Sequence, residues 1–371
     1  MNVLCDLTYL SPVSVSGVAI YTYRLLRGFI ELNKKDDFTL LLTPSSQEKF
    51  SKEFPDFKQI IFQPKEIRQI PHLGGVLNLK AFNKVIETNC YDLLFSPFVS
   101  HSGLYSKSIP SVGVFHDAHG YDLKTGLKGY IFRQASTRIL EFFTHIVTIS
   151  NYAKSDIIAK IPELTGKTSV IYNSISFNVC KHPDQRPATP YILNVNTLEP
   201  YKNLITLVKA FNLLKDDIPH TMVVKAKILP YWDTVILPYI KANRLDGRLK
   251  LIEDSISEQD MDYLYYNADL FVSPSLKEGF GYTPIEAALH EIPVICSKDT
   301  ALYETTMGLL NYYEPTMDEY ALKEAILHVL GNTSKVKLQH ISSVYKSTYS
   351  VKVQAQIFCD LFDSVIKNSH L

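Results

Sequence analysis

Residues 270–297, LFVSPSLKEGFGYTPIEAALHEIPVICS, decide the fold of this chain. The apolar run at 270–273 predicts a buried strand, and the serine, glycine and proline residues after it predict a loop. The segment 284–290 has a helical pattern, and 292–296 is a second apolar run. A strand, a loop, a helix and a strand in this order form the unit from which parallel sheets are built, so the stretch predicts an α/β fold.

The same alternation continues on both sides of this stretch. In the second half, further strands are expected near 191–195, 221–225 and 249–252, and helices near 203–214, 232–243, 258–267, 317–330 and 352–367. In the first half, strands are expected near 2–6, 38–43, 91–95, 111–116, 145–149 and 168–172, and helices near 17–32, 79–88, 127–143 and 151–160. The pattern predicts two doubly wound domains that face each other across a cleft. Residues 178–190 contain three prolines and no apolar period, which is typical of an interdomain connection.

The composition excludes several classes of protein. A chain of 371 residues with 46% hydrophobic and 20% charged residues is long enough for two cores, which excludes disorder as its main state. Its 38 basic and 38 acidic side chains balance, so the charge gives no reason to expect nucleic acid as a partner. The five cysteines form no CxxC pair, and no leader segment or membrane-spanning run is evident. We therefore expect a cytoplasmic protein.

The loop at 274–283 is suited to binding phosphate. Gly279 and Gly281 allow a ligand close to the backbone, and Pro284 suits the first position of a helix with Thr283 as its N-cap. The free N–H groups and the positive dipole end of such a helix favour an anion. The sequence therefore predicts a phosphate site at this loop.

Two acids, Glu278 and Glu286, bracket this loop with seven residues between them. Glu286 stands three residues after Thr283, so a capping box is an alternative interpretation that needs no ligand. Glu278 precedes a flexible Gly-Phe-Gly turn, and its alternative interpretation is a solvent-exposed acidic residue in a loop. As a pair, the two carboxylates are able to accept hydrogen bonds from the hydroxyls of a ribose and a hexose.

Several further segments carry a family resemblance. They are Ser-Gly-Val-Ala-Ile-Tyr-Thr at 16–22, Phe-His-Asp at 115–117, Thr-Ile-Ser-Asn-Tyr-Ala-Lys-Ser-Asp at 148–156, Asn-Thr-Leu-Glu-Pro-Tyr-Lys-Asn at 196–203 and Tyr-Ser at 349–350. With the Glu-x7-Glu spacing of 278–286, these segments resemble the retaining family-4 glycosyltransferases. The resemblance covers nearly the whole chain and implies the GT-B fold, with two Rossmann-like domains and a nucleotide-sugar donor. It also implies an N-terminal acceptor-binding domain (1–180), a C-terminal nucleotide-sugar-binding domain (181–350) and a final helix (351–371) that returns to the first domain.

The resemblance implies a role for each matching residue. Among the catalytic residues, Glu278 contacts the transferred sugar, Lys202 places a cation on the donor diphosphate, and His116 lies beside the reacting carbon. Glu286 holds the ribose. The other donor-binding residues are Gly17, Asn196, Gly279, Phe280, Gly281, Tyr282 and Thr283. Without the resemblance, Lys202 is typical of an exposed lysine at a helix start, and His116 of a structural histidine.

The chain departs from the family pattern at the phosphate and at the loop edges. Tyr201 replaces an expected arginine and Asn196 an expected glycine, so one phosphate cation is missing. Lys225 or Lys227, at the end of the next strand, is our candidate for its replacement. Tyr-Thr at 282–283 and Asn-Ser at 173–174 also differ from the family, which leaves a GDP-sugar and a UDP-sugar open as donor.

No metal or other cofactor is expected. Asp260-Met261-Asp262 is formally an Asp-x-Asp, but Ser257 and Glu258 before it predict the acidic first turn of a capped helix. The acceptor is less specified. The basic residues Lys124, Lys128, Arg133 and Arg138 alternate with the apolar residues Leu127, Tyr130, Ile131 and Phe132. They predict either an ordinary amphipathic helix or a surface for a lipid-linked acceptor and the cytosolic membrane face.

The function that follows from the resemblance is the metal-independent transfer of a hexose to a hydroxyl of a glycan or a lipid-linked saccharide, with retention of configuration. The sugar-nucleotide loop at 196–203 favours bacterial surface-polysaccharide assembly by family analogy. Two alternatives remain: a nucleotide-sugar epimerase or hydrolase of the same fold, and a non-catalytic partner subunit that binds the donor.

Overall fold

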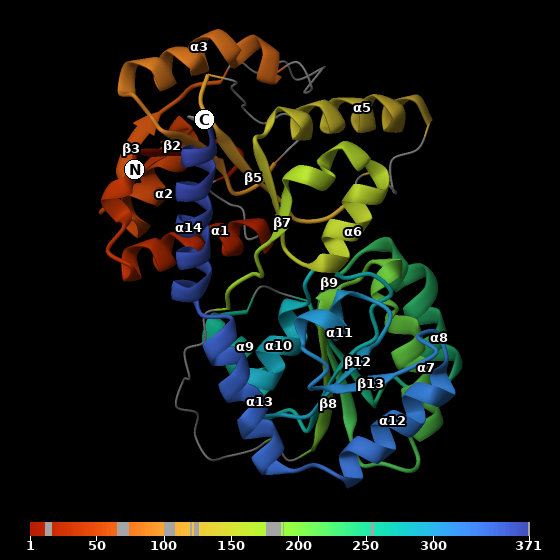
Figure 1. Ribbon diagram of the computed structural model, residues 1–371. Helices are drawn as coiled ribbons and strands as arrows, with labels where there is room; N and C mark the ends of the chain where they lie inside the picture. The colour runs from red at the N-terminus through yellow and green to blue at the C-terminus, as the bar shows by residue number, and fades with distance from the viewer. Residues whose placement is uncertain are drawn as a thin grey trace. The chain divides into compact units, whose positions relative to one another are not determined.

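The computed structural model of the protein describes residues 1–11, 17–64, 74–99, 108–118, 121, 126–175, 187, 189–253 and 256–369. The chain divides into two compact units. Unit 1 comprises Met1–Ser174 and Tyr349–Leu371, and unit 2 comprises Ile175–Thr348. Each unit is a parallel sheet with helices on both faces (Figure 1). Most of the proline-rich segment expected to connect two domains lies outside the described residues.

Unit 1 has a seven-stranded sheet in the order β3-β2-β1-β4-β5-β6-β7. Its strands are β1 (Val3–Asp6), β2 (Phe38–Leu42), β3 (Lys58–Ile61), β4 (Leu93–Ser96), β5 (Ser111–Phe115), β6 (His145–Thr148) and β7 (Thr168–Val170). Its described helices are α1 (Gly17–Glu31), α2 (Pro44–Glu53), α3 (Gly74–Asn89), α5 (Gly126–Phe142), α6 (Asn151–Lys160) and α14 (Val351–Ser369), with short helices η1 (Lys35–Asp37) and η3 (Pro162–Lys167). Paired strands are parallel throughout, and their order reverses between β1 and β4.

The C-terminal helix α14 belongs to unit 1, where it packs against α1 and crosses it (Figure 1). A Cβ added at Gly28 of α1 would lie 2.3 Å from the backbone oxygen of Val351, so glycine is required for this close approach. Phe358 and Phe362 of α14 also contact the ring of Phe95 in β4. The last helix therefore completes the core of the first unit.

Unit 2 has a six-stranded sheet in the order β10-β9-β8-β11-β12-β13. Its strands are β8 (Tyr191–Thr197), β9 (Thr221–Lys227), β10 (Leu249–Ile252), β11 (Leu270–Ser273), β12 (Val294–Ser297) and β13 (Asn311–Tyr313). Its described helices are α7 (Leu204–Leu214), α8 (Leu237–Ala242), α9 (Glu258–Tyr266), α10 (Tyr282–Leu289), α11 (Ala301–Thr305), α12 (Glu319–Gly331) and α13 (Lys335–Thr348), with short helices η4 (Pro200–Lys202) and η5 (Trp232–Ile236).

The strand order of unit 2 positions a ligand site. The order reverses between β8 and β11, and ligands of doubly wound sheets bind beyond the carboxyl ends of the strands at such a reversal. Helices α7, α8 and α12 lie on one side of the sheet, and α9, α10 and α13 on the other (Figure 1). The loops that follow β8 and β11 are therefore the segments in which to look for chemistry.

The expected fold class is confirmed, but two strands were missed. β3 and β13 are edge strands of four and three residues. Their residues are only partly buried and only partly apolar. A short, half-exposed edge strand lacks the continuous apolar run by which a central parallel strand is predicted from the sequence. None of the described helices has the length and apolarity needed to cross a bilayer.

Candidate active site

The loops after β8 and β11 are joined to each other at the carboxyl edge of the sheet of unit 2. The side-chain amide of Asn203 donates to the backbone oxygen of Pro274 at 3.1 Å. In return, the backbone N–H of Leu276 donates to the backbone oxygen of Tyr201 at 2.8 Å. These two bonds make one connected surface of two loops that lie far apart in sequence.

Lys202 and Glu278 meet on this surface. The ammonium of Lys202 donates to Oε1 of Glu278 at 2.7 Å, and the two side chains are 17% and 14% exposed. Lys202 is therefore not an exposed lysine at a helix start: its side chain is paired and partly buried, and it ends η4 just before Asn203, the N-cap of α7. Burial raises the pKa of the nearby Cys296 thiol, and the charge of Glu278 adds to this shift. The structure thus brings two of the predicted catalytic residues into direct contact.

The start of α10 differs from the expectation. The helix begins at Tyr282 with Gly281 as its N-cap, and no side chain caps it. Thr283 is therefore not the N-cap, Pro284 is the third helical residue, and the capping-box interpretation of Glu286 is wrong. Gly281 has a φ of 88°, and a Cβ there would lie 2.1 Å from Cδ2 of Leu302, so glycine is required for backbone and steric reasons.

A hydrogen bond from α11 holds the backbone of this turn. The hydroxyl of Thr305 in α11 donates to the backbone oxygen of Phe280 at 2.5 Å, and the Phe280 ring is buried. Phe280 therefore contributes its backbone, not its ring, to the exposed side of the turn. Because no side chain caps α10, the first turn of the helix keeps the features of an anion site.

The Glu286 side chain belongs to a network between α9 and α10. Its Oε2 accepts a hydrogen bond from the hydroxyl of Tyr265 at 3.2 Å. The Tyr265 ring stacks on the imidazole of His290, with 5.1 Å between centroids. His290 in turn places Nε2 2.5 Å from Oδ1 of Asp262, and Nδ1 2.7 Å from the backbone oxygen of Glu286. No role for Tyr265, Asp262 or His290 in a site was predicted from the sequence.

A signal for this network was present in the spacing. Asp262 and Tyr265 are three residues apart on one helix, and Glu286 and His290 are four residues apart on the other. Each pair therefore lies on one helix face. The sequence does not show that the two faces are opposed, because this depends on how α9 packs against α10.

The Asp-x-Asp element is a helix start, as expected. Asp260 forms a capping box with Ser257, the N-cap of α9, while Asp262 is buried beside His290. Within the described parts of the chain, no group of three or more His, Cys, Asp or Glu side chains is arranged to hold a metal ion.

Asn196 and the two candidate lysines lie on neighbouring strands. Asn194 donates to the backbone oxygen of Val272 at 2.8 Å, so its Oδ1 faces Asn196, whose amide nitrogen donates to it at 2.6 Å. Oδ1 of Asn196 is buried, with no hydrogen-bond partner among the described residues. In β9, Ala226 is buried in the core beside α7, so its neighbours Lys225 and Lys227 point to the other face of the sheet.

In unit 1, His116 follows the carboxyl end of β5 and is 9% exposed. Its Nε2 lies 2.9 Å from the backbone oxygen of Pro97, and its ring contacts the Tyr21 ring edge-on at 4.6 Å. A carbonyl only accepts, so Nε2 carries the hydrogen and Nδ1 the lone pair. Burial lowers the His116 pKa below its usual 6.5, which favours the neutral ring. Gly17 begins α1, and a Cβ there would meet nothing within 4 Å.

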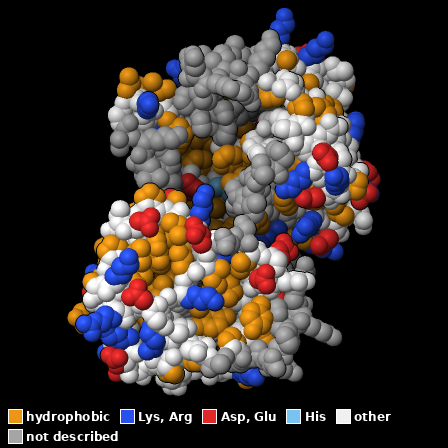
Figure 2. All heavy atoms as spheres, turned by 180° about the vertical axis from the view of Figure 1, so that it is seen from behind, with side chains coloured by type: hydrophobic (Ala, Val, Ile, Leu, Met, Phe, Trp, Pro, Cys, Tyr) orange, Lys and Arg blue, Asp and Glu red, His pale blue; other side chains and the backbone are white. Residues whose placement is uncertain are grey.

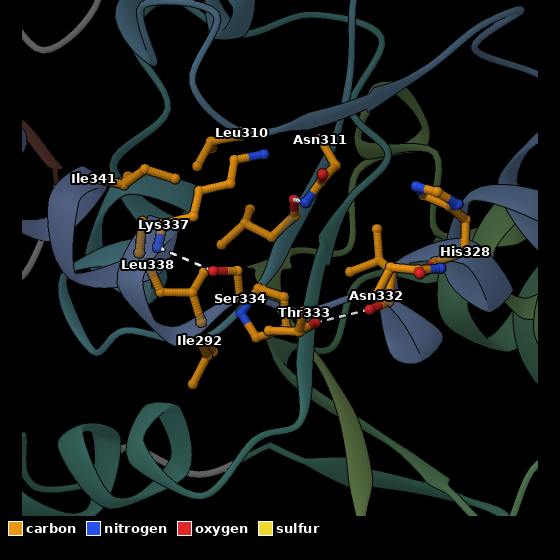
Figure 3. A pocket seen from close by; sticks show the side chains of 14 residues that line it. Ile292, Leu310, Asn311, His328, Asn332, Thr333, Ser334, Lys337, Leu338 and Ile341 are labelled. Atoms are coloured by element: carbon orange, nitrogen blue, oxygen red, sulfur yellow. Dashed lines mark hydrogen bonds between the residues drawn. The ribbon is translucent and has the colours of Figure 1, made fainter.

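A pocket of about 110 Å³ lies elsewhere in unit 2, at the amino ends of β12 and β13 (Figure 3). The residues labelled around it include His328, Asn332, Ser334 and Lys337, and none of the predicted site residues lines it. The face of unit 2 in the lower part of Figure 2 carries Lys, Arg, Asp and Glu side chains among apolar patches. Neither feature marks the predicted site, which lies at the carboxyl ends of the strands.

Two protein families match the chain, one in each half. Residues 181–341 match the family described as "Glycosyl transferases group 1", and residues 15–178 match the family described as "Glycosyltransferase Family 4". Together the two matches include every predicted site residue.

Curated relatives match parts of the chain. An O-antigen chain mannosyltransferase B of Escherichia coli is 32% identical over 145 residues, which is 39% of this chain and 38% of that protein. The O-antigen chain mannosyltransferase RfbU of Salmonella typhimurium is 30% identical over 186 residues, half of each chain. The match thus spans half or less of the length of these relatives.

Solved structures share the fold over the whole chain. A sucrose-phosphate synthase from Thermosynechococcus elongatus superposes with a TM-score of 0.77, at 15% identity, over 99% of this chain and 100% of that one. The Anabaena protein HepE in complex with UDP superposes with a TM-score of 0.72, at 17% identity, over 98% and 100%. At such identities the likeness concerns the fold alone, and it confirms the expected GT-B architecture of two parallel α/β sheets.

Proposed function

This chain belongs to the family-4 glycosyltransferases, and we propose that it transfers a hexose from a GDP- or UDP-sugar to a hydroxyl of a glycan or a lipid-linked saccharide. The observation that carries the proposal is the ion pair of Lys202 and Glu278 beside the uncapped start of α10. A partly buried cation, a carboxylate and a helix start that no side chain caps together suit a ligand that carries a diphosphate and sugar hydroxyls.

Donor binding rearranges the ion pair in this proposal. The diphosphate takes the Lys202 ammonium from Glu278, and the released carboxylate accepts hydrogen bonds from hydroxyls of the transferred sugar. The unpartnered Oδ1 of Asn196 supports a hydroxyl-bearing ligand, because phosphate oxygens only accept and would be repelled by it. The curated relatives with mannosyltransferase names and the HepE complexes with UDP make GDP- and UDP-sugars the two donors to test.

The reaction proceeds mainly by positioning and electrostatic stabilisation. The bond from the anomeric carbon to the diphosphate breaks, and the acceptor oxygen bonds to that carbon from the same face, which retains the configuration. The departing phosphate oxygen takes the acceptor proton. Lys202 and the amides of 279–282 stabilise the charge that grows on the leaving diphosphate, so no metal ion is required. His116 offers Nδ1 as an acceptor for a sugar hydroxyl.

The acceptor is the less defined partner. On α5, the apolar side chains of Leu127, Tyr130 and Ile131 are exposed, and so are the basic side chains of Lys128 and Arg138. These five residues suit a lipid-linked acceptor at the cytosolic membrane face, where anionic headgroups attract basic side chains. Of the other residues expected in this surface, Phe132 and Arg133 are half-buried, and Lys124 lies outside the described residues.

A panel of ligands tests the proposal. Thermal unfolding of the full chain is measured with UDP, GDP, UDP-glucose and GDP-mannose, with and without a chelator. A ligand at 100 times its dissociation constant stabilises the folded chain by about 2.7 kcal/mol. We expect one nucleotide series to stabilise the chain in the presence of the chelator, and its sugar to be transferred to a glycan acceptor. Binding without transfer to any acceptor would favour a non-catalytic subunit, and consumption of donor without acceptor a hydrolase or epimerase.

A further inference from the structure

We propose that Tyr265 is a positioning residue for Glu286, and that the Asp262–His290 pair holds Tyr265 in place. The inference rests on the proposed function, in which Glu286 binds the donor ribose. The inference goes beyond the proposed function by giving a role to three side chains of the network between α9 and α10. The starting observation is the hydrogen bond from the Tyr265 hydroxyl to Oε2 of Glu286 at 3.2 Å.

Ribose recognition needs an oriented carboxylate. The two neighbouring hydroxyls of a ribose both donate to one carboxylate only when its plane faces them, and a glutamate has three side-chain torsions to fix. The phenol hydroxyl of Tyr265 donates to one oxygen of Glu286 and so selects one orientation of the group. Tyr265 is itself 4% exposed, and its ring packs on that of Phe271 in the central strand β11. The Tyr265 ring is therefore held in place by its packing.

The imidazole of His290 bridges the two helices. Nδ1 faces the backbone oxygen of Glu286, and Nε2 faces the carboxylate of Asp262. His290 is also the C-cap of α10. The contact of His290 with Asp262 thus ties the end of α10 to α9.

The stacked rings transmit this constraint to the site. The planes of Tyr265 and His290 are 26° apart, and the Asp262 and His290 side chains are only 10% and 9% exposed. Tyr265 and Asp262 share α9, while Glu286 and His290 share α10. The relative position of the two helices and the direction of the Glu286 carboxylate are therefore fixed by the same four side chains.

A binding cycle with deoxynucleotides tests the inference. Calorimetry measures the dissociation constants of UDP or GDP, whichever the wild-type protein binds more tightly, and of its 2′-deoxy and 3′-deoxy analogues. The proteins are the wild type, Tyr265→Phe and Glu286→Gln. We expect Tyr265→Phe to weaken the ribonucleotide about fivefold, as for one lost hydrogen bond, and to leave the deoxy analogues within twofold. The preference of the wild type for the ribose would then largely disappear, as in Glu286→Gln.

Controls separate positioning from folding and from the proposed function. Tyr266→Phe removes a hydroxyl from the neighbouring, 40% exposed tyrosine of the same helix and should change none of the constants. Asp262→Asn should show the Tyr265→Phe pattern more weakly. In turnover, Tyr265→Phe should raise the donor KM and leave kcat within twofold. Equal weakening of ribo- and deoxynucleotides by Tyr265→Phe would overturn the positioning role alone. A wild-type protein that binds neither nucleotide would overturn the proposed function, and this inference with it.

Discussion

The candidate residues of the two units are held in different ways. In unit 2, polar side chains are paired with one another, the Lys202 ammonium with the Glu278 carboxylate and the Asp262 carboxylate with the His290 imidazole. In unit 1, His116 is buried against aromatic rings and a backbone carbonyl, and burial favours its neutral form. An ion pair stores charges that a ligand is able to take over, whereas a neutral buried ring offers only a fixed acceptor. The Lys202–Glu278 pair is therefore the contact that a ligand is able to rearrange, whereas the His116 ring keeps its place.

The largest expected effect concerns the charges of unit 2. Lys202→Ala removes the cation that stabilises the leaving diphosphate and leaves Glu278 without its partner. We expect kcat to fall by about 10²–10³, as when one stabilising donor is removed from an active site. Glu278→Gln should lower kcat by a similar factor. Nucleotide release in the presence of donor and acceptor measures the rate.

The matched control for this effect is Lys209→Ala, a lysine of α7 whose ammonium lies 3.9 Å from Glu319 at the surface. Its loss should leave turnover within twofold, because exposed ion pairs contribute little. Near-normal turnover of Lys202→Ala would contradict the assignment of the donor site to the β8 and β11 loops.

The second prediction compares two glycines, one in each unit. Gly281→Ala places a methyl group against Leu302 at a φ of 88°, so we expect unit 2 to lose about 3 kcal/mol of unfolding free energy. A Cβ at Gly17 meets no atom within 4 Å. Gly17→Ala should therefore change the unfolding free energy of unit 1 by no more than about 0.5 kcal/mol, the usual range for surface substitutions. Trp232, the one tryptophan of the chain, lies in unit 2 and reports its unfolding in urea. Equal stability of the two variants would show that the turn before α10 adapts.

The α10 region shows how much of the fold and site the sequence predicted. The strand, loop, helix and strand of 270–297 followed from a central apolar run and from the glycines and prolines after it. The position of the N-cap did not follow from the sequence, because it depends on the packing of Gly281 against Leu302, a residue distant in sequence. Lys202 and Glu278 are 76 residues apart, and only the family resemblance placed both at the donor. The roles of these site residues stay predictions.

The third prediction uses pH to test the neutral state of His116. Burial lowers its pKa in the folded chain, whereas the unfolded chain titrates near 6.5. Below pH 6.5 the unfolded state therefore gains a proton that the folded state resists. The unfolding free energy should be constant above this pH and fall below it by at most about 1.4 kcal/mol per pH unit.

His116→Asn isolates this contribution from those of the other histidines. Asparagine keeps an N–H for the Pro97 oxygen and does not titrate. The difference in stability between wild type and variant, measured by circular dichroism in urea at pH 7.5 and 5.5, should shift in favour of the variant at the lower pH. A difference that does not change with pH would show that His116 is exposed to protons in the folded chain.

The smallest expected effect concerns the cation that the family pattern lacks. Lys225 and Lys227 end β9 on the sheet face that carries α9 and α10, next to β8 and its loop. If one of them replaces the missing arginine, alanine at both positions should weaken UDP or GDP binding up to about fivefold at low salt, as expected for partly exposed charges. The loss should shrink at 0.5 M salt because the interaction is screened.

The control is Lys250→Ala on the neighbouring strand β10, which removes an exposed lysine and should change the dissociation constant little. An unchanged dissociation constant in the double variant would mean that Lys202 and the helix amides bind the diphosphate alone, and that unit 2 functions with one cation where the family pattern has two.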